Sequence, residues 1–309
     1  MLVRPLGNSG LATPRLVLGG NVFGWTLTGA EAFRVLDRFA EAGGTMIDTA
    51  DVYSAWVAGH KGGESESLIG QWLKAGGRRD VAIATKVGYE GGLSADHVEQ
   101  AAEASLRRLG VETIDLYYAH KDDSRTPLEE TLGAFDRLVR AGKVRAIGAS
   151  NYSAERLAAA LDLSEREGLA RYEVLQPEYN LMARDSYEGG VQGLCLARNI
   201  GVLPYFGLAS GFLTGKYRSE ADFGKSVRGS RMAAYLDERG RRVLAALDDV
   251  AAEAGATPAQ VALAWLAAQR GITAPIASAT SVEQLEELLG VMTLELGAGQ
   301  LERLSAAAA

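Results

Sequence analysis

Four side chains in the first 120 residues have the types needed to reduce a carbonyl group: Asp48, Tyr53, Lys86 and His120. A carbonyl that accepts hydride develops negative charge on its oxygen and needs a proton, which a tyrosine hydroxyl can donate. Because the ordinary pKa of tyrosine is about 10, we expect the ammonium of Lys86 to lower the pKa of Tyr53. A carboxylate at Asp48 would keep that ammonium charged. An imidazole at His120 would orient the carbonyl oxygen.

Each of these side chains also has an ordinary structural interpretation. Asp48 is a residue type that caps turns, and Lys86 can extend its ammonium to water from the end of an apolar strand. Tyr53 and His120 can be packing residues with one satisfied polar atom. Their placement favours a catalytic role, because each of them ends or follows a short apolar run.

The elements that must bring these side chains together are short apolar runs that alternate with helical patterns. Such runs are typical of strands covered on both faces. Eight of them favour a closed (β/α)8 TIM barrel, in which active residues gather at the carboxyl ends of the strands. An open doubly wound sheet remains the alternative, since alternation alone does not prove closure. The expected strands are residues 16–19, 46–48, 81–86, 114–118, 144–148, 173–176, 202–205 and 274–277.

Local signals predict how the remaining segments fold. Turn residues within 1–15 predict a short N-terminal β-hairpin ahead of the barrel. The segment 210–242 contains several glycines and basic residues and is predicted to be a long functional loop with short helices. Threonines followed by glutamate, glutamine or proline predict capped helix starts. These threonines are Thr28, Thr126 and Thr257.

Composition narrows the class of protein. The 309 residues include 32 Lys and Arg against 39 Asp and Glu, a net charge of −7, which argues against nucleic acid as a partner. Hydrophobic residues make up 47%, as in a globular chain rather than a disordered one. No shift in composition divides the sequence, so we expect one domain over residues 1–309.

The sequence favours neither a disulfide framework nor a metal site. Cys195 is the only cysteine, and His60, His97 and His120 show no metal-ligand spacing. The N-terminus has no long apolar run typical of a signal peptide, and no segment has the roughly 20 apolar residues of a membrane span. We therefore expect a cytoplasmic protein without a membrane partner.

Two nucleotide-binding motifs can be excluded. A Rossmann G-x-G-x-x-G motif does not occur. The run SGFLTGKY at 210–217 approaches a P-loop, but Ser210 stands at its first glycine position and Tyr217 at its magnesium-binding position.

An ordered set of motifs resembles the aldo-keto reductase family over nearly the whole chain. The motifs are DTADVY at 48–53, ATK at 84–86, YYAH at 117–120, GASN at 148–151, QPEYN at 176–180, LASGFLTGK at 208–216 and QLEE at 284–287. The resemblance implies an oxidoreductase that reversibly reduces an aldehyde or ketone. Tyr53 would be the general acid, Lys86 and Asp48 its tuning groups, and His120 the residue that orients the carbonyl.

The resemblance also implies NADP(H), bound in extended form without a Rossmann fold. Ser150, Asn151 and Gln176 would hold the carboxamide and Tyr205 would stack on the nicotinamide. The other expected cofactor contacts are Gly20 and Asn21 near the ribose and nicotinamide, Leu208, Ser210, Gly211 and Lys216 at the pyrophosphate, Arg231, Thr280, Gln284 and Glu287 at the adenosine end, and also Asp48 and Ser278. The expected substrate pocket is lined by Phe23, Trp25, Trp56 and Tyr89.

Departures from the family pattern keep the coenzyme open. Thr280 stands where many members have arginine, and it can hydrogen-bond a 2′-phosphate but cannot neutralise it. NAD(H) is therefore the alternative to NADP(H), with Arg228 or Arg231 as substitutes for the missing charge.

The sequence allows two other interpretations. A nicotinamide-binding redox sensor resembling the potassium-channel β subunits is the main alternative, although the complete catalytic set favours an enzyme acting on a small carbonyl or alcohol. A metal-dependent barrel hydrolase lacks a cluster of histidine and aspartate ligands. The sequence indicates no oligomeric state.

Overall fold

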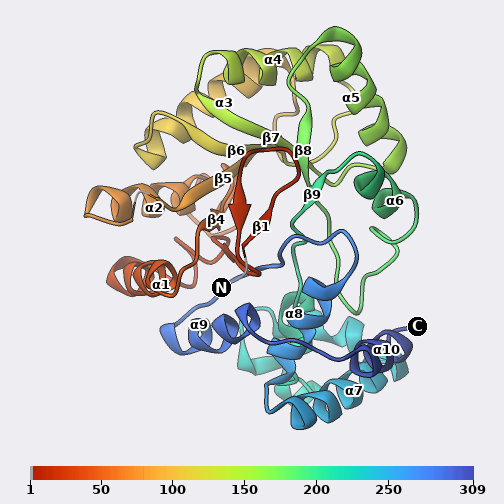
Figure 1. The fold of residues 1–309 in the computed structure, drawn as a ribbon. Coiled ribbons are helices and arrows are strands. Elements are labelled where there is room, and N and C mark those ends of the chain that lie inside the picture. Colours follow the sequence, from red (N-terminus) through yellow and green to blue (C-terminus); the bar gives the residue numbers. More distant parts are fainter. Residues whose placement is uncertain (1–2, 79) are drawn as a thin grey trace.

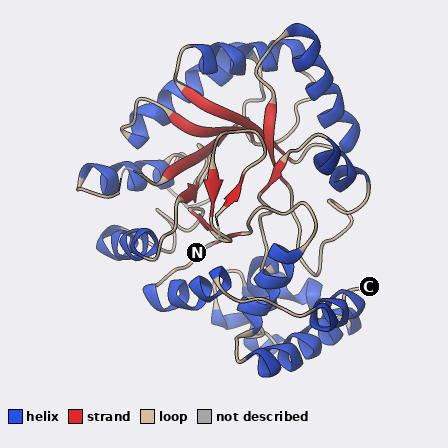
Figure 2. Cartoon of the chain, viewed as in Figure 1, coloured by secondary structure: helices blue, strands red, loops and turns tan. Residues whose placement is uncertain are grey.

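The strands form a curled parallel sheet surrounded by helices (Figures 1 and 2). The computed structural model describes residues 3–78 and 80–309. Strand order follows the chain except that the last strand pairs with the first barrel strand, as a barrel requires. Across the sheet the strands are β10 (Ile276–Ala277), β3 (Val17–Gly19), β4 (Met46–Asp48), β5 (Ala82–Val87), β6 (Ile114–Ala119), β7 (Val144–Ser150), β8 (Tyr172–Gln176) and β9 (Gly201–Val202).

Hydrogen bonds also join the two edges of this sheet. The backbone N–H of Thr273 donates to the carbonyl of Val202 at 2.9 Å, and the N–H of Ile276 donates to that of Pro204 at 2.9 Å. These bonds connect β9 and the residues that follow it with β10 and the residues that precede it. The (β/α)8 barrel is therefore confirmed, and the open doubly wound sheet is not the fold.

Apolar side chains fill the barrel interior. Val17, Met46 and Leu116, from three different strands, belong to one buried cluster. Leu6 and Leu11, which precede the barrel, belong to the same cluster. The interior is thus a packed core and not a channel, as is usual for barrels of eight strands.

The expected N-terminal hairpin closes one end of this core. Strands β1 (Arg4–Pro5) and β2 (Ala12–Thr13) pair antiparallel, while residues 1 and 2 lie outside the described part of the chain. A Cβ on Gly7 would lie 2.5 Å from the carbonyl of Glu173 and 2.7 Å from the nitrogen of Gly201. The hairpin therefore covers the amino-terminal end of the barrel and leaves the opposite end for ligands (Figure 1).

Helices cover the outside of the sheet and bury its outer face in a second core. Helix α8 is buried along nearly all of its length, as its continuous apolar sequence predicts. The helices are α1 (Gly29–Glu41), α2 (Glu64–Lys74), α3 (Ala95–Leu109), α4 (Leu128–Arg140), α5 (Ala154–Glu167), α6 (Gly190–Ala197), α7 (Glu238–Ala254), α8 (Pro258–Ala268), α9 (Val282–Leu289) and α10 (Ala298–Ala307). In the described part of the chain, no helix has both the length and the apolar composition needed to cross a bilayer.

Of the three expected helix caps, one is confirmed. Thr257 and Gln260 form a complete capping box at the start of α8. Thr28 precedes α1 but makes no side-chain cap hydrogen bond, so that capping box is wrong. Helix α4 begins one residue later than expected, because Pro127 has an extended ψ of 140° and the Thr126 hydroxyl donates to Asp123 instead.

Residues 210–237 form a long connection with short helices, as expected, whereas residues 238–242, expected in the same loop, already belong to α7. The connection contains η1 (Ala209–Thr214), η2 (Glu220–Lys225) and η3 (Gly229–Tyr235) before α7 begins. A further short helix, η4 (Gly290–Met292), follows α9.

Candidate active site

Lys86 lies at the centre of the candidate site. Its ammonium donates to Asp48 Oδ2 at 2.7 Å, to the carbonyl of Thr49 at 2.7 Å and to the hydroxyl of Tyr53 at 3.0 Å. The Lys86 side chain has no exposed surface and that of Asp48 is 3% exposed. The structure therefore brings three of the four expected catalytic residues into one buried hydrogen-bonded group.

The chain after β4 folds so that Tyr53 turns back onto Lys86. The N–H of Asp51 donates to the carbonyl of Lys86, and the N–H of Tyr53 donates to that of Ala50. Ser54 then adopts a φ of 73°, and its buried hydroxyl donates to the carbonyl of Phe23 at 2.8 Å. A left-handed residue other than glycine costs free energy, and such residues often lie at functional sites.

The net direction of the Tyr53 pKa shift differs from the expectation. Burial raises the pKa of Tyr53 above its ordinary value more strongly than Lys86 lowers it, and Asp48 raises it further. Lys86 thus acts on the Tyr53 pKa in the expected direction, but burial outweighs it, and the sequence did not reveal how much burial the phenol experiences. Burial lowers the pKa of Lys86, but Asp48 and Tyr53 together raise it by more. The group at neutral pH is a protonated phenol beside an ammonium–carboxylate pair.

His120 lies beside Tyr53 and is neutral. Burial lowers its pKa well below the ordinary value, and the ammonium groups of Lys86 and Lys121 lower it further. Its ring centroid lies 6.0 Å from that of Tyr53 and 5.0 Å from that of Tyr89. Its Nδ1 is buried and has no hydrogen-bond partner among the described residues. A neutral imidazole beside the phenol can hydrogen-bond a carbonyl oxygen without adding charge.

The residues expected at the carboxamide form a second polar group that connects to the first. Gln176 donates to Asp48 Oδ1 at 2.8 Å, and the hydroxyl of Ser150 donates to the carbonyl of Gln176 at 2.7 Å. Asn151, with a φ of 58°, donates to the carbonyl of His120 and accepts from the hydroxyl of Tyr205 at 2.8 Å. The ends of β4, β6, β7 and β8 thus meet at one mouth.

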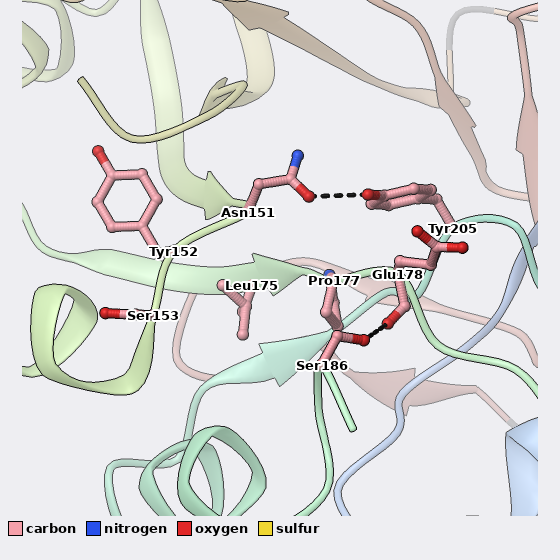
Figure 3. Close-up of a pocket in the computed structure, with 8 residues that line it drawn as sticks. All are labelled: Asn151, Tyr152, Ser153, Leu175, Pro177, Glu178, Ser186 and Tyr205. Atoms are coloured by element: carbon pink, nitrogen blue, oxygen red, sulfur yellow. Dashed lines mark hydrogen bonds between the residues drawn. The ribbon is translucent and has the colours of Figure 1, made fainter. Parts of the chain in front are cut away.

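A cavity of about 280 Å³ lies beside this polar group. Figure 3 shows Asn151 and Tyr205 joined by a hydrogen bond at one side of it, and Glu178 and Ser186 on another. Tyr205 follows β9 and pairs with Glu178 in an isolated parallel bridge, so the strand expected at 202–205 is shorter than predicted. The flat Tyr205 ring is nevertheless held at the end of the sheet.

The segment expected at the pyrophosphate has an unusual backbone. Ala209, Ser210 and Gly211 have consecutive positive φ angles of 46°, 58° and 104°, and Leu208 precedes them. A Cβ on Gly211 would lie 3.9 Å from the ammonium of Lys216, so these two expected residues are adjacent. Curved backbone of this kind, with an ammonium beside it, suits a phosphate group.

The remaining expected cofactor residues lie around β3, β10 and α9. Ser278 donates to Asn21 Oδ1 at 2.7 Å, and a Cβ on Gly20 would lie 2.9 Å from the carbonyl of Asp48, so glycine permits close strand packing there. At the start of α9, Gln284 accepts from both the backbone and the hydroxyl of Thr280. Two further residues are less connected: the carbonyl of Glu287 accepts from Gln260, and Arg231 is exposed on η3.

The aromatic residues expected to line a substrate pocket divide into two kinds. Trp25 and Trp56 pack edge to face with centroids 5.6 Å apart, and Trp56 lies 6.0 Å from Tyr53. Trp56 is 50% exposed and Tyr89 49% exposed, as at an open mouth. Phe23, however, has no exposed surface and packs in the core, so it presents no wall to a ligand in this structure.

The sequence patterns did not indicate a buried charged pair between Glu66 and Arg108, next to Thr85 on β5. Glu66 on α2 is fully buried, accepts from the Thr85 hydroxyl at 2.5 Å and pairs with Arg108 at 2.6 Å. Asp51 lies nearby, and burial together with the charge of Glu66 raises its pKa to about 7, although Arg108 opposes this rise. The available signal was Glu66 on the apolar face of a helix, which requires a partner.

Among the described residues there is no group of three or more His, Cys, Asp or Glu side chains that could hold a metal ion.

The family model described as the aldo/keto reductase family matches residues 15–309. The chain belongs to the aldo-keto reductase family. Membership supports an oxidoreductase that acts on carbonyl groups with a nicotinamide cofactor.

Three relatives illustrate the range of proteins that this aldo-keto reductase resembles. Aldo-keto reductase yakc of Schizosaccharomyces pombe, named with NADP(+), is 36% identical over 85% of this chain and 78% of its own. The uncharacterized oxidoreductase YrpG of Bacillus subtilis is 36% identical over 94% and 91%. A probable voltage-gated potassium channel subunit beta of Arabidopsis thaliana is 33% identical over 93% and 90%.

Proposed function

We propose that this protein reversibly reduces an aldehyde or ketone to an alcohol with NAD(P)H, and that Tyr53 donates the proton. The observation that supports this most is the 3.0 Å hydrogen bond between the Tyr53 hydroxyl and the Lys86 ammonium, itself anchored by Asp48 at 2.7 Å. A phenol in a purely structural role would not need a fully buried ion pair as its partner.

Each side chain then has a distinct task. Tyr53 remains protonated at neutral pH because of burial, so it can give its proton to the oxygen of the substrate. The ammonium of Lys86 stabilises the phenolate that forms, and Asp48 keeps Lys86 charged and in place. Neutral His120 orients the carbonyl oxygen toward Tyr53.

The site has side chains that fit a nicotinamide cofactor. Asn151 and Gln176 carry amides that can exchange hydrogen bonds with a carboxamide, and Tyr205 offers an aromatic face beside them. Leu208, Ser210, Gly211 and Lys216 would hold the diphosphate. When bound, the reduced cofactor supplies the hydride.

The preference between the two coenzymes rests on the adenosine end. Thr280 and Gln284 are neutral, and their side chains bond each other. Arg231 is the exposed cation that we propose for a 2′-phosphate, which favours NADP(H) as the coenzyme. Fluorescence titration of the protein with NADPH and NADH measures this preference. Tighter binding of NADPH than of NADH supports this preference, whereas equal binding of the two, or tighter binding of NADH, would contradict it.

The activity itself is tested by absorbance at 340 nm with a panel of small aldehydes and ketones. We expect turnover of about 1 s⁻¹ or faster for the best substrates, the range typical of enzymes. Tight coenzyme binding with negligible turnover on the whole panel would count against a reductase.

That second outcome defines the alternative function, a redox sensor that reads the state of its nicotinamide. The similarity to a probable potassium channel subunit beta favours it. A sensor needs slow turnover so that the bound coenzyme persists. Single-turnover oxidation of bound NADPH, measured against steady-state turnover, therefore separates the two functions.

A further inference from the structure

Arg228 stands at the edge of the aromatic wall beside the proposed proton donor. Its guanidinium carbon lies 5.1 Å from the ring centroid of Trp25. Trp25 packs against Trp56, and Trp56 packs against Tyr53, so one continuous row of rings joins Arg228 to the reacting hydroxyl. A cation over an aromatic face is held there by the ring quadrupole.

The guanidinium of Arg228 has no acidic partner. Most arginines in the described part of the chain pair with a carboxylate, whereas within those residues no carboxylate lies within 4 Å of Arg228. Its side chain is half-buried. Burial lowers its pKa and the neighbouring cation Arg231 lowers it further, while Tyr217 and Tyr53 raise it. Partial burial of a cation without a counterion costs free energy, and an anionic ligand that pairs with the cation offsets this cost.

The backbone holds Arg228 in this position. The hydroxyl of Ser226 accepts from the N–H of Arg228 at 3.2 Å and contacts the hydroxyl of buried Tyr217 at 2.6 Å. Gly229 comes next, and a Cβ there would lie 1.7 Å from the carbonyl of Phe223, so the chain packs too closely for any other residue. The fold therefore fixes the position of the Arg228 backbone.

A second unpaired cation lies near the other end of the mouth. The ammonium of Lys121 lies 4.7 Å from the ring centroid of Tyr89, which itself packs against His120. Lys121 is exposed, so water screens it more than Arg228. Arg228 thus contacts the aromatic rings that lead to Tyr53, and Lys121 contacts a ring that packs against His120, although the whole chain carries a net charge of −7.

We propose that the substrate of this site is an anionic carbonyl compound, whose carboxylate or phosphate pairs with Arg228 while its carbonyl reaches Tyr53 and His120. This inference rests on the proposed reductase function and specifies the class of its substrate. The planar guanidinium can bind either anion through two parallel hydrogen bonds. The aromatic row between Arg228 and Tyr53 would contact the carbon chain that joins the two ends of the substrate.

The test compares carbonyl compounds that differ only in charge. 4-Oxobutanoate is paired with its methyl ester, 4-carboxybenzaldehyde with its methyl ester, and glyceraldehyde 3-phosphate with glyceraldehyde. For at least one pair we expect kcat/KM to be about 10- to 100-fold higher for the anion at low ionic strength, and this ratio to fall as salt is added. A wild-type protein that reduces both members of every pair equally well would overturn the inference and leave the reductase function standing. Failure to reduce any member would refute the reductase function itself.

Variants assign the preference to Arg228. Arg228→Gln should lower kcat/KM for the anions more than for the esters and so bring the anion-to-ester ratio close to one, and Arg228→Lys should restore part of the ratio. Arg242→Gln, which removes the same charge from an exposed ion pair on α7, is the matched control and should leave the ratio as in the wild type. Lys121→Met should have a smaller effect than Arg228→Gln.

The same variants distinguish the substrate from the coenzyme as the anion recognised. Dissociation constants for NADPH, measured by fluorescence, should be unchanged in Arg228→Gln. If this variant instead weakens NADPH binding and lowers kcat/KM equally for anions and esters, Arg228 contacts the coenzyme and the inference is overturned.

Discussion

The replacement Lys86→Met tests how the buried catalytic group stabilises the fold as well as the chemistry. It removes the ammonium and leaves the carboxylate of Asp48, which is 3% exposed, without its ionic partner. Removing one member of a buried ion pair costs about 3 to 5 kcal/mol. A domain has about 5 to 15 kcal/mol of unfolding free energy in total, so the loss should be large.

The assay is equilibrium unfolding in urea, followed by circular dichroism. The control is Lys143→Met, because Lys143 pairs with Glu103 on the surface, where both side chains are more than 40% exposed. That pair should contribute about 0 to 1 kcal/mol. The double variant Asp48→Asn with Lys86→Met leaves no buried charge and should regain part of the lost stability. A Lys86→Met protein within about 1 kcal/mol of the wild type would refute the account of a tightly coupled buried pair.

Three further predictions concern pH and helix capping. The pKa of Asp51 is raised to about 7, so the folded state keeps a proton that the unfolded chain releases near the ordinary pKa of aspartate. The resulting stabilisation is present in acid and is lost as pH rises through about 7. Asp51→Asn should therefore remove this pH dependence from the unfolding free energy measured between pH 5 and 8. The pKa of His120 is lowered, so at pH values below the ordinary histidine pKa of about 6.5 the unfolded chain binds a proton that the folded state does not, and stability falls as pH falls. The NMR signals of the His120 imidazole should be those of the neutral ring at pH 6. An imidazolium at that pH would contradict the assignment. Thr257→Ala should cost about 1 kcal/mol in urea unfolding, whereas Thr28→Ala should be nearly neutral because Thr28 caps nothing, and equal losses would refute this reading of the two helix starts.

The sequence predicted the strands and the residues at their ends well. The runs at 46–48 and 114–118 are short and apolar, which distinguishes strands buried on both faces from the longer helical patterns. Barrel topology then places the residue at each carboxyl end at a common mouth. For that reason Asp48, Lys86 and Gln176 could be grouped before their contacts were known.

What the sequence could not supply depends on the path of the chain through space. Thr28 carries the same local signal as Thr257, but only Thr257 has a chain geometry that lets its hydroxyl reach the helix. The pKa of Tyr53 depends on burial by distant segments, which no local pattern reports. Arg228 and Trp25 are about 200 residues apart in sequence, so their contact is a product of the tertiary fold alone.

The central claim is that the phenol of Tyr53 is the proton donor to the substrate. The replacement Tyr53→Phe keeps the ring that packs against Trp56 and removes only the hydroxyl that bonds Lys86. Measured by oxidation of NADPH at 340 nm, kcat should fall by about 10²- to 10⁴-fold, as for the loss of a general acid, while the dissociation constant for NADPH stays that of the wild type. A Tyr53→Phe protein with turnover close to that of the wild type would contradict the assignment.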